Sequence, residues 1–231
     1  MPDAQKVNSM FARIASRYDL ANRMLSFGID RMWRDRLVDE VDLRKPRAVV
    51  DLATGSGDVA FALRQGLARE TRVVGLDFCA PMIEEAKRKQ LRFNEPAIEF
   101  GIGDILDLPL EDGCANAVTI SFGYRNLQDR HQGLLEIHRI LDAEDGRVFI
   151  LEFSQPYAMY RPFYYFYLKR VLPLIARIIT GDLEAYQYLC GSIESFPGRE
   201  GVTAELENAG FKNIQAIPMA LGSVALHIGQ A

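Results

Sequence analysis

The sequence AVVDLATGSGD, residues 48–58, joins a short apolar run to a loop that contains two glycines. The segment from Val59 to Leu67 follows directly and has the pattern of a helix. Gly55 and Gly57 allow positive φ angles and a close approach of the backbone to a ligand. The first turn of a helix offers N–H groups that have no partner within the helix. This order of strand, glycine loop and helix predicts a ligand site at the carboxyl edge of a parallel sheet.

Strand-like and helix-like segments alternate outward from this loop. Strands are expected at 71–77, 97–101, 115–122 and 147–153, and helices at 80–91 and 131–141. Such alternation predicts βαβ units and a parallel sheet. Two last strand-like runs, 211–218 and 223–228, are joined by a short turn, so this pair must be antiparallel. The buried stripe of the last helix is expected at Leu134, Leu135, Ile137, His138 and Leu141.

We expect one domain over residues 1–231, with helices added to the wound core at two places. Its expected parts are an N-terminal helical cap (1–45), a cofactor-binding core (46–153), a helical lid insert (154–199), and a terminal helix with a β-hairpin (200–231). The cap is expected to be helical because Val7, Phe11, Ile14 and Tyr18 recur at helical spacing.

The composition excludes several classes of protein. The chain has 27 basic and 31 acidic residues and a net charge of −4, so we expect no nucleic-acid partner, because neutralising phosphates requires a basic surplus. Apolar residues make up 48% of the chain, too many for a disordered tail protein. Cys79, Cys114 and Cys190 lack the spacing of a disulfide framework or a zinc site, so we expect no metal. No secretory or membrane-spanning segment is recognisable, which predicts a soluble or peripheral protein of the cytoplasm.

Acidic residues at the strand ends indicate which cofactor the glycine loop binds. Asp77 ends the strand after the loop, where a carboxylate can accept hydrogen bonds from ribose hydroxyls. The pattern Gly55-x-Gly57-x-x-Ala60 also fits a dinucleotide, which leaves an NAD(P)-dependent reductase as an alternative. Asp51 and Asp58 would repel a pyrophosphate. Asp51 can organise a loop around an ammonium group, and Asp104 can accept from an adenine amino group, as S-adenosylmethionine requires.

Several separate motifs, in order, resemble the ubiquinone/menaquinone biosynthesis C-methyltransferases, a family of class I S-adenosylmethionine-dependent enzymes. The matching stretches are VNSMFARIASRYDLANRMLSFGIDRMWR (7–34), DLATGSGD (51–58), TISFGYRNLQD (119–129), LEFSQP (151–156), EAYQYLCGSIESFP (184–197), ENAGF (207–211) and VALHIG (224–229). The resemblance covers roughly residues 7–229. It implies a Rossmann-like α/β fold with a seven-stranded, mostly parallel sheet whose last strand is antiparallel.

The resemblance also implies a set of cofactor contacts. In addition to Asp51, Gly55 and Gly57 of the loop, they are Ser56, Asp77, Asp104, Ile105 and Ser121. Ser56 stands where threonine is common in the family and keeps the hydroxyl. Tyr124 occupies a position that is usually aliphatic, beside the expected active site, which leaves the shape of the substrate pocket open.

The implied reaction is C-methylation of a polyprenyl quinol, with demethylmenaquinol preferred and 2-polyprenyl-6-methoxy-1,4-benzoquinol as the alternative. A non-catalytic S-adenosylmethionine-binding scaffold is a further alternative. We expect Arg125 to stabilise the phenolate or to order the water that takes its proton, because a guanidinium is itself a poor base. Tyr18 is expected to orient cofactor or substrate. Glu152, at the end of its strand, is expected to act as a base or a substrate contact.

Residues 157–179 of the lid insert combine many aromatic side chains with four cations. The cations are Arg161, Lys169, Arg170 and Arg177. Aromatic rings and basic side chains together suit a membrane interface. The segment therefore has three interpretations: a lid over the substrate, a lid that also makes peripheral contact with the inner face of the membrane, or the interface of a homodimer.

Overall fold

The computed structural model describes residues 8–9, 12–13, 23, 26, 28–95, 97–171 and 183–231, the last range without the side chains of residues 183–186. Tyr18, which was expected to contact the cofactor or substrate, lies outside the described residues. The same is true of most of the cap expected to be helical before residue 28.

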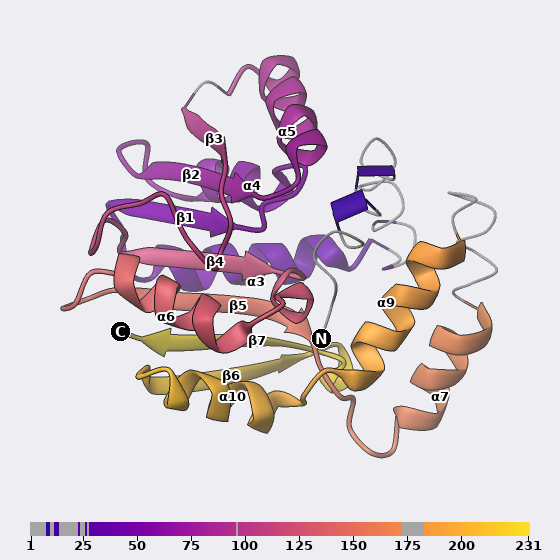
Figure 1. Cartoon of the computed structure of the whole chain (residues 1–231). Helices are drawn as coiled ribbons and strands as arrows, with labels where there is room; N and C mark the ends of the chain where they lie inside the picture. Colours follow the sequence, from indigo (N-terminus) through magenta and orange to yellow (C-terminus); the bar gives the residue numbers. More distant parts are fainter. Residues whose placement is uncertain are drawn as a thin grey trace.

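A seven-stranded sheet runs through the described part of the chain, in the order β3-β2-β1-β4-β5-β7-β6 (Figure 1). The strands are β1 (Ala48–Leu52), β2 (Arg72–Asp77), β3 (Ile98–Ile102), β4 (Ala117–Ser121), β5 (Arg147–Phe153), β6 (Lys212–Met219) and β7 (Val224–Gln230). Pairs among β1 to β5 are parallel. The fold class expected from the sequence is therefore confirmed.

The last strand, β7, lies between β5 and β6 and is antiparallel to both. Ile150 of β5 pairs with His227, which in turn pairs with Ala216 of β6. A short 3₁₀ turn, η4 (Ala220–Gly222), connects β6 to β7. A turn of this length can only reverse the chain, as the sequence predicts.

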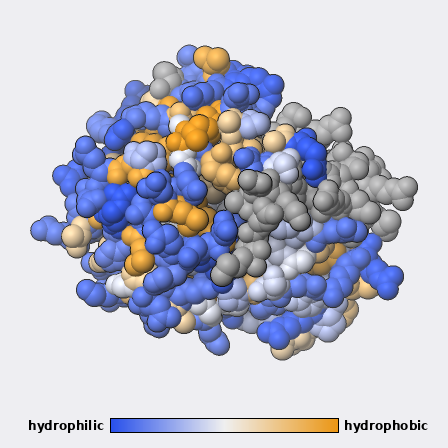
Figure 2. Space-filling view, in the orientation of Figure 1, coloured by the Kyte–Doolittle hydropathy of each residue, from blue (hydrophilic) through white to orange (hydrophobic). Residues whose placement is uncertain are grey.

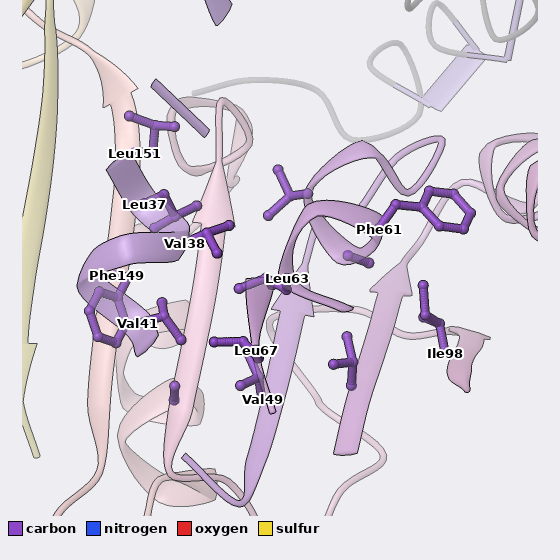
Figure 3. Close-up of a cluster of buried hydrophobic side chains, with 14 of the residues drawn as sticks. Leu37, Val38, Val41, Val49, Phe61, Leu63, Leu67, Ile98, Phe149 and Leu151 are labelled. Carbon is purple, nitrogen blue, oxygen red and sulfur yellow. The ribbon is translucent and has the colours of Figure 1, made fainter. Parts of the chain in front are cut away.

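Helices cover both faces of the sheet, and their bounds follow the apolar periodicity of the sequence. They are α3 (Asp30–Asp42), α4 (Asp58–Gly66), α5 (Ala80–Phe93), α6 (Arg130–Ile140) and α10 (Arg199–Asn208). In Figure 1, α6 and α10 lie in front of the sheet and α3 and α4 lie behind it. Figure 3 shows one of the two cores, in which Leu37, Val38 and Val41 of α3 lie near Phe149 and Leu151 of β5.

The lid insert leaves the sheet after β5 and returns to it at α10. Its described elements are α7 (Arg161–Phe166), the π-helical turn η3 (Tyr167–Val171) and α9 (Leu183–Ser195). Figure 1 shows α7 and α9 beyond the carboxyl ends of β4 and β5. Among the described residues, no helix has the length and apolar character needed to cross a bilayer.

Candidate functional site

A cleft of about 850 Å³ opens at the carboxyl edge of the sheet, where the ends of β1 to β4 meet. Ala53 and Gly55 follow β1, and Ser121 to Gly123 follow β4. The strand order reverses between β1 and β4, and ligands of open α/β sheets bind at this point. The remaining lining residues are Asp77, Phe78, Met82, Gly103, Asp104, Ile105, Leu106, Asn126, Leu127 and Gln128.

The loop after β1 is held in an unusual backbone conformation. Gly55 and Gly57 have φ angles of 56° and 87°, and Ala53 also has a positive φ, 50°. Across the cleft Phe122 has φ 56°. A non-glycine residue in this region costs of order 1 kcal/mol, and such residues cluster at ligand sites. A Cβ atom at Gly123 would lie 2.5 Å from that of Ala53, so the two loops meet as closely as glycine permits.

Asp51 lies beneath this loop and does not line the cleft. Its side chain accepts hydrogen bonds from the hydroxyls of Thr54 and Thr119, both at 2.6 Å. Burial raises the pKa of Asp51 to about 7, although the two hydroxyl donors oppose that shift. Asp51 therefore fastens the glycine loop to β4 from below, the organising role expected of it, and it does so at the cost of a buried charge.

Asp77 lies at the centre of the cleft wall with both carboxylate oxygens engaged. Oδ2 accepts from the backbone N–H of Gly55 and Oδ1 from that of Cys79, each at 2.8 Å. Burial raises the pKa of Asp77, and the two backbone donors oppose this. A carboxylate offers about four acceptor positions. Two of them remain for the hydroxyls of a ribose.

The remaining predicted contacts differ in how they face the cleft. Asp104 is exposed at the rim, and its Oδ1 accepts from the N–H of Leu106 at 3.0 Å. Ile105 is buried and forms an apolar wall. Ser121 lines the cleft with a buried Oγ that has no hydrogen-bond partner in the described structure. An orphaned buried hydroxyl is costly unless a ligand satisfies it.

Ser56 does not line the cleft, contrary to what the resemblance implied for its hydroxyl. The ammonium of Lys89 donates to Ser56 Oγ at 3.0 Å and to Ser56 O at 3.1 Å. Lys89 also pairs with Asp58 at 2.6 Å, and Arg34 of α3 pairs with Asp58 at 3.1 Å. Ser56 and Gly57 therefore shape the loop from its far side, toward α5, and Asp58 carries no free charge toward the cleft.

The sequence did not single out several of the lining residues. They are Phe78, Met82, Gly103, Leu106, Phe122, Gly123, Leu127 and Gln128. Most of them lie one to six residues beyond the end of a predicted strand. This position was the signal in the sequence that could have identified them as lining residues. Phe122 lay inside the predicted strand 115–122, which in the structure ends one residue earlier, at Ser121.

The arrangement fits an adenosine-bearing cofactor with a charged amino-acid end. Asp77 can hold the ribose, Ile105 can pack on the adenine beside Asp104, and Ser121 offers an unused hydroxyl. Gly123 has no side chain to cover the backbone where the loop after β4 meets Ala53 of the loop after β1, so a ligand can approach the backbone of both loops there. No group of His, Cys, Asp and Glu that could hold a metal occurs in the described ranges.

Arg125 and Glu152, expected separately, are brought together as a buried ion pair. Arg125 follows β4 in the short helical turn η2 (Tyr124–Asn126), and Glu152 ends β5. Arg125 Nη1 donates to Glu152 Oε1 at 2.8 Å, and the backbone N–H of Arg125 donates to Oε2 at 3.1 Å. The side chains are 6% and 2% exposed, so each charge depends on the other. Arg125 Nη1 also donates to the carbonyl of Phe122, and the guanidinium lies 5.1 Å from the ring centroid of Phe153.

The lid insert packs over this pair with polar side chains. Ser192 of α9 accepts from Arg125 Nε at 3.4 Å, and the Tyr188 hydroxyl donates to Asn126 Oδ1 at 3.0 Å. Burial raises the pKa of both Tyr164 and Tyr188, and the nearby charge of Arg125 opposes the shift. Both phenols therefore stay neutral near the charge of Arg125.

Tyr124 differs from the residue usual in the family, so the sequence alone did not predict the shape of the substrate pocket. In the structure this side chain points away from the cleft. Its ring is fully buried, and its hydroxyl donates to Glu205 of α10 at 2.7 Å. Arg130 pairs with the same carboxylate at 2.7 Å. Burial and the charge of Glu205 raise the pKa of Tyr124. The unusual residue thus joins η2 to α10 within the core.

The fold and the cleft together define a class I S-adenosylmethionine-dependent methyltransferase. The ubiE/COQ5 methyltransferase family matches residues 2–231, and the chain belongs to this family.

Individual relatives and solved structures agree with this family. The demethylmenaquinone methyltransferase of Thermus thermophilus is 43% identical over 222 residues, which cover 95% of this chain and 99% of the relative. The ubiquinone/menaquinone biosynthesis C-methyltransferase UbiE of Geotalea uraniireducens is 40% identical over 228 residues, covering 98% and 96%. A crystal structure of an S-adenosylmethionine-dependent methyltransferase from Thermotoga maritima has a TM-score of 0.66 at 15% identity, covering 96% of this chain and 98% of that one. The structural likeness supports the fold alone.

Proposed function

We propose that the protein transfers a methyl group from S-adenosylmethionine to a ring carbon of demethylmenaquinol. The observation that carries this proposal is the nearly full-length identity of 43% to the Thermus thermophilus demethylmenaquinone methyltransferase. Membership of a methyltransferase family disfavours the alternative of an NAD(P)-dependent reductase.

The bound cofactor would supply an electrophilic methyl group, and the protein would prepare the carbon nucleophile. A quinol ring carbon becomes nucleophilic when a neighbouring hydroxyl loses its proton. We assign the stabilisation of that oxyanion to Arg125. Its Nη2 bonds to no acceptor within the described ranges, so this nitrogen can donate to a phenolate or to a water.

We propose that Glu152 positions Arg125 and does not remove the proton. Glu152 accepts from the N–H and Nη1 of Arg125 and from the N–H of Phe153 at 2.8 Å. These three donors engage both carboxylate oxygens and hold them against Arg125 and the backbone, so Glu152 is placed to orient Arg125. The substrate hydroxyl would then lose its proton to a water at the mouth of the cleft.

The test is a mass-spectrometric assay with S-adenosylmethionine and two short-tailed reduced substrates, demethylmenaquinol and 2-prenyl-6-methoxy-1,4-benzoquinol. We expect the mass of one methylene to be added to demethylmenaquinol. An Arg125→Met variant should bind S-adenosylhomocysteine as the wild type does and lose at least a hundredfold in kcat. Tight binding of S-adenosylhomocysteine without transfer to either quinol would contradict the proposal and favour the scaffold.

Methoxybenzoquinol is the second candidate substrate because several relatives carry both pathways in their names. The Geotalea uraniireducens relative, at 40% identity, is one of them. Faster turnover of the benzoquinol in the same assay would reverse the order of the two substrates.

We further propose that α7 contacts a lipid surface, where a polyprenyl substrate resides. Met159, Phe163 and Phe166 are 75%, 75% and 65% exposed, although each is apolar. Arg161 and Arg170, both exposed, lie on the same segment. In Figure 2, apolar side chains lie between hydrophilic ones in the region of α7. Exposed aromatic rings beside cations suit an anionic bilayer.

Vesicle sedimentation tests this contact. The wild type should bind vesicles that contain phosphatidylglycerol, and the double variant Phe163→Ser/Phe166→Ser should bind at least fivefold more weakly. Leu91→Ser is the matched control, because Leu91 is 83% exposed on α5, on another part of the surface. Equal binding of all three proteins would contradict the proposal, and dimerisation of the wild type that the double variant abolishes would favour a homodimer interface.

A further inference from the structure

Two half-buried phenylalanines lie side by side where the cofactor cleft meets the Arg125–Glu152 pair. Phe122 follows β4 and lines the cleft, and Phe153 ends β5. Their ring centroids are 4.8 Å apart, with the planes inclined by 51°. Both are only partly buried, so ring surface remains for a ligand. We call Phe122 and Phe153 the aromatic shelf.

A hydrogen-bond donor stands at each end of the aromatic shelf. The guanidinium of Arg125 lies 5.1 Å from the ring centroid of Phe153. At the other end, the indole of Trp33 in α3 packs on Phe122 with centroids 5.8 Å apart. The aromatic shelf therefore has the indole of Trp33 next to Phe122 and the guanidinium of Arg125 next to Phe153.

The indole N–H of Trp33 is an unexplained feature of the fold. Trp33 is 8% exposed, and its Nε1 has no acceptor in the part of the chain that the structure describes. A buried donor without a partner is unfavourable in the folded protein. Ser121, the residue before Phe122 in the chain, also has a buried Oγ without a partner among the described residues. The unpartnered indole N–H of Trp33, whose ring packs on Phe122, points to a ligand that satisfies it.

We propose that the aromatic shelf binds the ring of the substrate and that Trp33 donates its indole N–H to one of the two ring oxygens. This inference rests on the proposed function. A quinol carries its oxygens on opposite sides of one ring, and the aromatic shelf has a donor at each end. With Trp33 on one oxygen and Arg125 on the other, the substrate ring would contact the side chains of Phe122 and Phe153 at the mouth of the cofactor cleft.

The chain contains a single tryptophan, so its indole emission reports on Trp33 alone. Titration with a short-tailed oxidised demethylmenaquinone should quench this emission saturably, and free N-acetyltryptophanamide corrects for absorption by the quinone. S-adenosylhomocysteine alone should cause a much smaller change. Emission that stays constant while the same quinone inhibits methyl transfer would overturn the proposal.

The variant Trp33→Phe keeps an aromatic ring and removes the N–H. We expect the KM for the quinol to rise about two- to tenfold, the loss of one hydrogen bond, with kcat and the KM for S-adenosylmethionine nearly unchanged. Phe149→Leu is the matched control, since Phe149 belongs to the same core as Trp33 but lies in mid-strand on β5. It should lower Tm without changing the quinol KM.

The outcomes separate this inference from the proposed function. An unchanged quinol KM in folded Trp33→Phe, or an equal rise in the control, overturns the role of Trp33 while methyl transfer stands. Wild-type protein that methylates neither quinol refutes the proposed function. Saturable quenching by the quinone would then still support a ring-binding shelf, and the absence of quenching would refute both.

Discussion

Replacing Asp51 with asparagine should make the stability of the protein less dependent on pH. The side chain of Asp51 is wholly buried, and its pKa of about 7 lies well above the value of 3.8 for a solvated aspartate. The native state therefore retains a proton that the unfolded state has lost between these two values. Stability contributed by the neutral form is present below pH 4 and is lost as the pH rises toward 7.

The two pKa values set the size of this effect. Relative to Asp51→Asn, the wild type should lose on the order of 2–3 kcal/mol of unfolding free energy between pH 5 and pH 8. Urea unfolding of both proteins without ligand, at half-unit pH steps, measures the difference. Asp35→Asn is the control, because Asp35 is exposed on α3. A difference between wild type and variant that stays constant across this range would refute a buried charge beneath the loop.

Three further variants test contacts around the cleft. Tyr124→Phe removes the hydrogen bond to Glu205 and should lower Tm by about 2–4 °C, the equivalent of about 1 kcal/mol; an unchanged Tm would mean that the hydroxyl adds nothing. Gly123→Ala should weaken S-adenosylhomocysteine binding about tenfold in calorimetry through its clash with Ala53, and Ala53→Gly in the same chain should restore it; failure of this rescue would contradict the packing argument. Glu152→Gln should cost about 3–5 kcal/mol in urea unfolding because it strands the charge of Arg125; a loss below 1 kcal/mol would show that the pair is dispensable.

The sheet could be predicted because each strand carries a local signal. The strand Arg147–Phe153 has the predicted bounds, since a continuous apolar run between two turns leaves little choice. The buried face of α6 was predicted less well. Leu135 is 42% exposed and Ile140 is fully buried, the reverse of the expected stripe. Apolar residues on adjacent faces of a helix fit the same helical periodicity. Which of them is buried depends on the element that packs against the helix.

Part of the cleft lining could be predicted from the strand ends, whereas the contacts between the predicted site residues could not. Asp77 ends β2, and its position after the glycine loop can be read directly from the sequence. The pairing of Arg125 with Glu152 depends on the register of β4 against β5, in which Ser121 faces Leu151. The direction of the Ser56 side chain depends on the backbone dihedral angles of the glycine loop, which the spacing of residues in the motif does not predict.

The position of the lid insert makes the cover over the Arg125–Glu152 pair exchangeable. The segment leaves from the end of β5 and rejoins the sheet at α10, so both of its ends are fixed by elements that the cofactor cleft does not need. Doubling the length of such a connection costs only about 0.6 kcal/mol in loop-closure entropy. Evolution can therefore lengthen, shorten or replace this segment while the seven strands and the glycine loop stay in register. Chimeras that swap only this segment between relatives would change the cover over the site while Phe122, Arg125 and Phe153 stay in place.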